Sequence, residues 1–459
     1  MVMLKKVSGW SRIERHNLRD SLAQVLVRRA VRRNRAAGNA REHVRSLAQR
    51  PGACIAVVVR GHLGDMLAAI PVLRAIRRRY PLSRIIVITN QYALPAVEWC
   101  PYVDQVIGFF RFYEGRRMAF VKRIWGRISM LRLIARLFGK VDVSLHLRWV
   151  GGDSLLMHEL IGAKAQVGFS QEAHGEVLSI NLGEKRPGRS FREWNIEVLE
   201  PLGLEDVAQD MEVWTPPADE RAVDLLLRQV PASDGSRFVC FHPRAHWGCV
   251  EWIPQRWATL GDEIYRRHGL RTVITGSASD AGLAQQIASH MVNKPIVATG
   301  KTSFAELAVL YRRSLAVVGV DSIARALCQA LKQPCVILYE AGEAAWCAPL
   351  PDEPIVVLNQ NTAAVSLAMA GPLCEKERGS CHNPLCRLNQ QAAIEVADVV
   401  AAVEQLLDPR KRLSVALKPD RGAAFSGTLM RSGIGANGAG AALAAQHSLG
   451  ATPPEGREP

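Results

Sequence analysis

Short runs of β-branched and other apolar residues alternate with helix-like stretches over most of the chain. The first run, CIAVVVR, starts at Cys54; a GHLGD turn and a helical pattern over residues 66–81 follow it. The apolar runs RIIVIT, VDQVIGF and VDVSLHLR come next, with a helix-like ALPAVEWCP between the first two. Strands that alternate with helices predict a parallel sheet with crossover connections, and hence an α/β domain.

A second series of the same kind follows a region rich in Pro, Asp, Ser and Gly. Its strands are expected at RFVCFHP, RTVITG, PIVATG, LAVVGVD and PCVILYE, with a helical pattern after each of the first four. The sequence therefore predicts two Rossmann-like domains, 51–205 and 237–408, joined by a linker region at 206–236. Residues 409–459, rich in Gly, Ala, Ser and Pro, predict a disordered tail.

The amino-acid composition agrees with two folded domains and bears on where in the cell the protein lies. The 459 residues are 48% hydrophobic and 22% charged, as in soluble globular proteins. We find no apolar run of about 18 residues, the length that crosses a bilayer, and no signal peptide at the start. The ten cysteines are scattered, which favours reduced thiols over a disulfide framework. A cytoplasmic protein is expected.

The formal charge of +15 is concentrated in two segments. Residues 1–50 carry thirteen Lys and Arg against three Asp and Glu, which predicts a basic helical or disordered arm. This arm either lies on an anionic surface or is a solvated tail. A second basic, amphipathic segment at 111–140 adds to the case for a peripheral contact with an anionic membrane. No DNA- or RNA-binding motif accompanies the charge, so a nucleic-acid partner is disfavoured.

The loop Arg60–Asp65, RGHLGD, joins the first predicted strand to its helix. It matches neither the GxGxxG dinucleotide pattern nor a phosphate loop with Lys and Ser/Thr. Gly61 and Gly64 allow a tight turn, and Asp65 stands at the start of the helix. The carboxylate is either a helix cap or a general base for an acceptor hydroxyl.

Three loops of the second domain follow predicted strands, at residues 241–248, 275–280 and 319–327. The second ends in Asp280, an acid placed to reach a ribose, and the third begins its helix with Asp321 and Ser322. Ligands of parallel α/β sheets bind at the carboxyl ends of the strands, where helix N-termini attract phosphate. Each loop alone is a weak signal, but together they predict a nucleotide-type site.

Over residues 53–408 the order of motifs resembles glycosyltransferase family 9, the ADP-heptose:lipopolysaccharide heptosyltransferases. The matching blocks are LGDMLAAIPVLRAIRRRYP with VDQVIGF, HPRAHWGCVEWIPQRWATLGDEI, VITGSASDAGLAQQIA, GKTSFAELAVLYRRS and VGVDSIARALCQALKQPCVILYE. The resemblance implies a GT-B fold, in which two parallel sheets face one cleft. It also implies inverting, metal-independent sugar transfer from a nucleotide diphosphate sugar, with ADP-sugar favoured, to a lipid-linked glycan such as lipopolysaccharide. No cofactor is implied, and the place of action would be the inner face of the cytoplasmic membrane.

The resemblance also implies roles for single residues. The acid of the family's GD loop falls on Asp65, which would take the acceptor proton, and Gly61, His62 and Gly64 would form the acceptor loop. Asp280 would contact the ribose, and Asp321 and Ser322 would begin the phosphate motif. The full predicted donor-binding set is Arg244, His246, Gly276, Asp280, Thr302, Asp321, Ser322 and Arg325.

The sequence departs from the family pattern at three positions. Ile323 and Ala326 stand where the family has Gly and His, and Val250 stands where it has Lys. Arg244, His246 or Arg325 would then supply the missing phosphate contacts, since an Arg fork suits phosphate. The alternative is a catalytically silent relative that binds sugar nucleotides or acts as a scaffold.

A late cluster contains Cys374, Cys381, His382 and Cys386 in the segment CEKERGSCHNPLC. Its spacing lacks a CxxC pair, so a local loop is favoured over a zinc site. Similar Cys-rich segments occur near the end of family 9 members. The cluster therefore supports the resemblance, and no metal is predicted.

Overall fold

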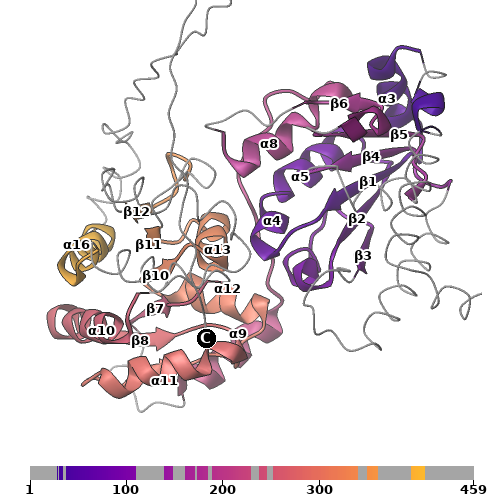
Figure 1. Ribbon diagram of the computed structural model, residues 1–459. Coiled ribbons are helices and arrows are strands. Elements are labelled where there is room, and N and C mark those ends of the chain that lie inside the picture. Colours follow the sequence, from indigo (N-terminus) through magenta and orange to yellow (C-terminus); the bar gives the residue numbers. More distant parts are fainter. Residues whose placement is uncertain are drawn as a thin grey trace, which may run out of the picture. The chain divides into compact units, whose positions relative to one another are not determined.

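The structure is a computed structural model of the chain. It describes residues 28, 30–34, 38–109, 139–147, 161–170, 173–183, 189–228, 237–245, 252–339, 349–359 and 394–408. These residues form two α/β lobes, each built on its own sheet (Figure 1). The predicted tail 409–459, the Cys374–Cys386 cluster, residues 1–27 and nearly all of the basic segment 111–140 lie outside the described residues.

The N-terminal lobe contains a six-stranded, all-parallel sheet with the order β3-β2-β1-β4-β5-β6. This is the strand order of Rossmann-type domains. Because β1 lies in the middle of the sheet, all six of its residues are buried. The strands are β1 (Cys54–Val59), β2 (Arg84–Asn90), β3 (Gln105–Phe109), β4 (Val143–His146), β5 (Ala165–Gly168) and β6 (Ile180–Asn181).

The helix expected over residues 66–81 is in fact two helices. α4 (Leu63–Leu67) ends before Ala69, and α5 (Ile70–Arg79) starts there with Pro71 in its first turn. Pro71 has no N–H to continue the ladder of α4, which is why the helix breaks here. The lobe's other helical elements are α3 (Ala40–Gln49), η1 (Gln91–Ala96), η2 (Ala173–Val177), α8 (Phe191–Glu197) and η3 (Glu200–Leu202).

The C-terminal lobe repeats the architecture of the first. Its parallel sheet has the order β12-β11-β10-β7-β8-β9, the same Rossmann order counted within the lobe. The predicted second series of strands is therefore confirmed, and β12 is added to it. The strands are β7 (Phe238–His242), β8 (Arg271–Ile274), β9 (Ile296–Val297), β10 (Ala316–Val320), β11 (Cys335–Tyr339) and β12 (Ile355–Asn359).

Helices cover both faces of the second sheet. Val239 and Phe241 of β7 pack with one group, α10, α11 and α16, whereas Phe238 and Cys240 belong to the core on the other face, with α9, α12 and α13. This alternation is the period of two expected for a strand buried on both sides. The helical elements are α9 (Pro217–Arg228), α10 (Pro254–His268), η5 (Ala278–Asp280), α11 (Ala281–His290), α12 (Phe304–Arg313), α13 (Ile323–Leu331) and α16 (Val396–Leu407).

The described part of the segment 1–50 packs on the N-terminal lobe. Arg33 Nη2 donates to the carbonyl of Val177 at 3.1 Å, and Arg45 Nε donates to that of Pro201 at 3.1 Å. Arg50 forms an ion pair with Asp142 at 3.0 Å. The lobe therefore starts before the predicted boundary at residue 50, because these guanidinium groups bind backbone carbonyls and a carboxylate of the lobe.

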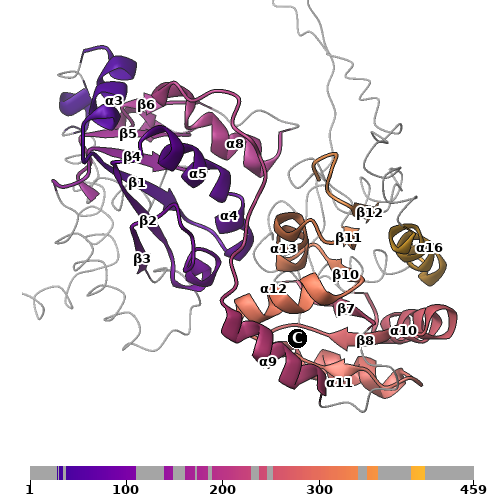
Figure 2. The same ribbon diagram turned by 180° about the vertical axis from the view of Figure 1, so that it is seen from behind.

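The predicted linker region 206–236 also contains ordered structure. Its helix α9 packs beside α12 (Figures 1 and 2). There Arg313 Nη1 lies 2.7 Å from Asp224 Oδ1. Arg312 forms a second ion pair with Glu220. α9 therefore belongs to the C-terminal lobe, whereas Ala208 and Glu212, nearer the start of the predicted linker, bind Arg74 of the N-terminal lobe. No helix among the described residues is long and apolar enough to cross a bilayer.

Candidate active site

In both lobes the strand order reverses at one point, and ligands of such sheets bind outside the carboxyl ends of the strands there. The reversal lies between β1 and β4 in the first lobe and between β7 and β10 in the second. Every described residue of the predicted site follows the carboxyl end of a strand. After β1 come Gly61, His62, Gly64 and Asp65; after β7, Arg244; after β8, Gly276 and Asp280; after β9, Thr302; and after β10, Asp321, Ser322 and Arg325. His246 and Val250 lie outside the described residues.

The β1–α4 loop folds back on itself around Asp65. Asp65 Oδ2 accepts a hydrogen bond from the His62 backbone N–H at 2.8 Å, which completes a capping box at the start of α4. A Cβ added to Gly61 would lie 2.1 Å from the same Oδ2, so only glycine fits beneath the carboxylate. The N-cap position predicted for Asp65 is therefore occupied by His62, and Asp65 is its N3 partner in the capping box.

An asparagine at the end of the neighbouring strand, β2, binds this loop; the sequence analysis did not predict its role. Asn90, at the end of β2 and 2% exposed, donates from Nδ2 to the carbonyl of Gly61 at 2.7 Å. A polar residue that ends an otherwise apolar strand beside β1 is the signal that could have revealed it. The Asp65 loop is thus held by a bond within the loop, from His62, and by a bond from β2.

A buried histidine ends β4 at the reversal point of the first lobe. His146 is 1% exposed, and its Nε2 lies 2.9 Å from Ser144 Oγ. Burial, with a smaller contribution from the positive charge of Arg60, lowers the pKa of His146 to about 3. The ring is therefore neutral at pH 7, so it adds no positive charge to the Asp65 loop.

The second lobe places His242 at the corresponding point, the end of β7. Its Nδ1 lies 2.9 Å from the Tyr311 hydroxyl and 3.0 Å from Thr275 Oγ1. Burial lowers the pKa of His242 to about 4, and the charge of Asp280 opposes this only in part. His242 thus joins β7, β8 and α12 through neutral hydrogen bonds. Like Asn90 and His146, it was missed by the sequence analysis.

The depressed pKa of His242 predicts acid-sensitive stability. Its folded pKa of about 4 is below the unfolded value near 6.5, so the stabilisation is complete above pH 6.5 and is lost as pH falls toward 4. Between pH 7 and 4 we expect this group to remove about 3 kcal/mol of unfolding free energy. Urea unfolding of wild type and of His242→Asn at both pH values measures the difference. Equal pH dependence in the two proteins would contradict the prediction.

Asp280 and Arg244, two predicted donor-binding residues, lie next to each other. Asp280 Oδ2 accepts from the backbone N–H and from the hydroxyl of Ser277, both at 2.7 Å, and Oδ1 lies 3.4 Å from Arg244 Nε. The adjoining β9–α12 turn is close: the Gly300 N–H donates to the Gly276 carbonyl at 2.9 Å. The loop that carries Thr302 therefore lies against the Asp280 loop.

The start of α13 forms the third part of the predicted donor site. Ser322 caps the helix by accepting from the Ala324 N–H at 3.3 Å. Arg325 Nε donates to Asp321 Oδ1 at 2.8 Å, and Arg325 Nη1 donates to Gln329 Oε1 at 2.7 Å. The guanidinium predicted to replace a missing phosphate contact is thus held at the carboxyl end of β10.

Ala326, one of the positions at which the sequence departs from the family pattern, lies close to Gly64 of α4. Ala326 is 2% exposed, and a Cβ added at Gly64 would lie 3.4 Å from its Cβ. The side chain of Ala326 therefore faces the acceptor loop at a point where both residues are small. A longer side chain at position 326 would have to displace α4 or turn away from it.

Two all-parallel Rossmann-like lobes, with candidate loops at the carboxyl ends of their strands, define a GT-B glycosyltransferase fold. Solved structures support this. A glycosyltransferase family 9 protein from Veillonella parvula superimposes with a TM-score of 0.62 at 22% identity, covering 78% of this chain and 99% of that one. The E. coli heptosyltransferase WaaC with ADP gives a TM-score of 0.55 at 14% identity, covering 77% and 99%.

Sequence comparison shows similarity to the same family. The family model described as glycosyltransferase family 9 (heptosyltransferase) matches residues 154–373. Lipopolysaccharide heptosyltransferase 3 of E. coli K12 is 26% identical over 295 residues, which cover 62% of this chain and 82% of that protein. A second E. coli protein of that name is 22% identical over 352 residues, covering 75% and 96%. These comparisons support the resemblance inferred from the motifs: the chain is similar to glycosyltransferase family 9 over residues 154–373, and to lipopolysaccharide heptosyltransferases of E. coli.

Proposed function

We propose that this protein transfers a heptose-type sugar from an ADP-sugar to a glycan acceptor of the lipopolysaccharide type. The single observation that carries the proposal is the arrangement of the β1–α4 loop at the carboxyl edge of the first sheet. There the His62 N–H binds the Asp65 carboxylate, and Asn90 binds the carbonyl of Gly61 beneath it. The donor comes from the relatives, one of which is the ADP-bound WaaC. The acceptor comes from the names of the curated relatives.

The proposed reaction is a single displacement at the anomeric carbon. The acceptor oxygen forms the new bond as Asp65 takes its proton, and the bond from the anomeric carbon to the phosphate oxygen breaks, which releases ADP and inverts the configuration. The charge on the leaving diphosphate would be met by Arg325 and by the backbone amides at the start of α13. We propose that these groups meet the charge without a metal ion.

The basic segments support a place of action beside the acceptor. We propose that the basic residues of the segments 1–50 and 111–140 draw the protein to the anionic inner face of the cytoplasmic membrane, where a lipid-linked acceptor would be met. The alternative of a silent relative rests on Ile323, Ala326 and Val250. It predicts nucleotide binding without transfer.

A thermal-shift screen with ADP-, GDP-, UDP- and CMP-sugars tests the donor, because a ligand that binds only the folded state raises the melting temperature. We expect the largest shift with an ADP-sugar. Asp280→Ala and Asp321→Ala should each weaken that binding roughly tenfold or more, since each removes a charge that orders a donor loop. Absence of any shift in the wild type would contradict the proposed function, and unchanged affinity in both variants would place the donor elsewhere.

A further inference from the structure

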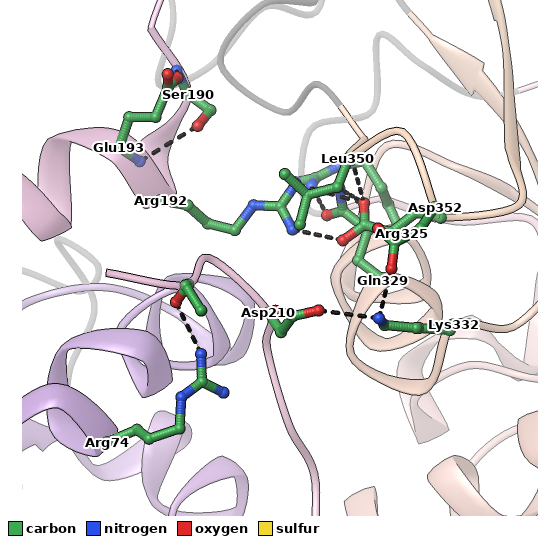
Figure 3. Close-up of polar contacts among 12 residues, drawn as sticks. Arg74, Ser190, Arg192, Glu193, Asp210, Arg325, Gln329, Lys332, Leu350 and Asp352 are labelled. Atoms are coloured by element: carbon green, nitrogen blue, oxygen red, sulfur yellow. Dashed lines mark hydrogen bonds and ion pairs between the residues drawn. The ribbon is translucent and has the colours of Figure 1, made fainter. Parts of the chain in front are cut away.

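A buried ion pair joins the N-terminal lobe to the connection between β11 and β12. Arg192 lies in the first turn of α8, a helix fixed to its lobe by the bond from Asn195 Nδ2 to the Ala68 carbonyl at 2.9 Å. Arg192 pairs with Glu353, and the two side chains are 4% and 1% exposed. Figure 3 shows Arg192 reaching from α8 toward Gln329 and Leu350.

The pair is one end of a continuous chain of hydrogen bonds. Glu353 Oε2 accepts from Gln329 Nε2 at 3.0 Å, and the other amide atom, Gln329 Oε1, accepts from Arg325 at 2.7 Å. Arg325 in turn donates to Asp321 at 2.8 Å. These five side chains, the Arg192–Asp321 relay, connect a helix of the first lobe with the end of β10 in the second.

Donors and acceptors alternate along the whole relay. Gln329 must present its NH₂ to the carboxylate of Glu353 and its oxygen to the guanidinium of Arg325. In the reverse orientation, two donors would face each other at Arg325 and two acceptors at Glu353. The orientation of Arg325 therefore depends on Glu353, which depends on Arg192. Burying two charges gives little net stability, so stability alone does not explain such a pair.

We propose that Arg192, Glu353 and Gln329 are positioning residues for the donor site. They hold Arg325 beside Asp321 in the orientation that receives the nucleotide diphosphate, and they make donor binding depend on the lobe that carries Asp65. This inference rests on the proposed function, because it takes the Asp321–Arg325 segment as the diphosphate site. It assigns a role in donor binding to α8, a helix that contributes no predicted donor-binding residue.

Gln329→Met is the sharpest test, because it interrupts the relay while both ion pairs keep their partners. We expect the Kd for ADP, measured by calorimetry on the full chain, to rise about tenfold, equal to about 1.4 kcal/mol. Arg192→Lys, which keeps the charge but loses the two-pronged geometry of Arg, should weaken ADP binding by a smaller factor. Lys332→Met is the matched control: the same helix loses its contacts with Asp210 and Asp352, outside the relay, and ADP affinity should not change.

A double-mutant cycle separates positioning from damage to the helix. If Gln329 acts through Arg325, then Gln329→Met should add no further loss of ADP affinity in an Arg325→Met background. An unchanged Kd in Gln329→Met, an equal loss in Lys332→Met, or a full additional loss in the Arg325→Met background would each overturn the proposal. Wild-type protein that does not bind ADP would instead contradict the proposed function itself, and the relay's role with it.

Discussion

Replacing Asp65 by Asn is expected to lower the rate of sugar transfer by about 10²- to 10⁴-fold, the usual contribution of a general base. Donor affinity should stay the same, because the predicted donor loops lie in the other lobe. The amide oxygen of Asn can still accept from the His62 N–H, so the cap on α4 survives while the proton acceptor is lost. Release of ADP during turnover gives the rate, and calorimetry with ADP gives the affinity.

A second capping carboxylate supplies the matched control for this substitution. Asp398 Oδ2 accepts from the backbone N–H of Glu395 at 3.2 Å at the start of α16, away from the predicted site loops. Asp398→Asn removes a charge from the same kind of cap and should leave transfer unchanged. If Asp65→Asn retained full turnover, the carboxylate would be a cap only, and the base would have to be sought elsewhere.

The sequence predicted the fold well because its signals were long and repeated. Runs such as CIAVVV and LAVVGV are buried on both faces in parallel sheets, so they read as continuous apolar segments. β5 and β6 were missed because neither lies in a run of large apolar residues: Gln166 interrupts β5, and β6 contains a single apolar residue, Ile180. The break between α4 and α5 was missed because Pro71 falls inside an otherwise uninterrupted helical pattern.

The loops of the candidate site were predictable, but their internal contacts were not. Strand order alone gathers Asp65, Asp280 and Asp321 at carboxyl ends, since all strands in each sheet are parallel. The partner of each side chain depends on which loops become neighbours in space. Asn90 reaches Gly61 across 29 positions, and Gln329 reaches Glu353 across 24, distances at which a single sequence carries no pairing signal.

The contacts of Arg325 could not be predicted from the sequence either. Its sequence neighbours suggested only a positive charge near the phosphate motif. The structure adds that Arg325 is held by Asp321 and Gln329, and that Ala326 beside it packs toward Gly64. A small residue at position 326 therefore accompanies the close approach of α4 and α13, and the cation is one position earlier in the helix.

Gly61→Ala is expected to reduce transfer about as strongly as a direct change at Asp65, the proposed general base. The new Cβ would lie 2.1 Å from Asp65 Oδ2 and 2.4 Å from Asp65 Cβ, so the aspartate side chain or the loop must move. Misplacement of a reacting group by about 1 Å can cost roughly 10²-fold in rate. The loss of the cap should cost about 1 kcal/mol of stability, which leaves the protein folded.

Because Gly61 and Asp65 act on the same carboxylate, their effects on turnover should not add. The double variant Gly61→Ala with Asp65→Asn should be no slower than about the slower of the two single variants, whereas independent sites would multiply their losses. Gly282 is the control glycine: a Cβ there meets nothing within 4 Å, so Gly282→Ala should keep full turnover and gain about 0.5–1 kcal/mol of stability. ADP affinity should be the same in all four proteins. Full turnover by Gly61→Ala would show that the loop tolerates a displaced Asp65, and the carboxylate would then not be the group that takes the acceptor proton.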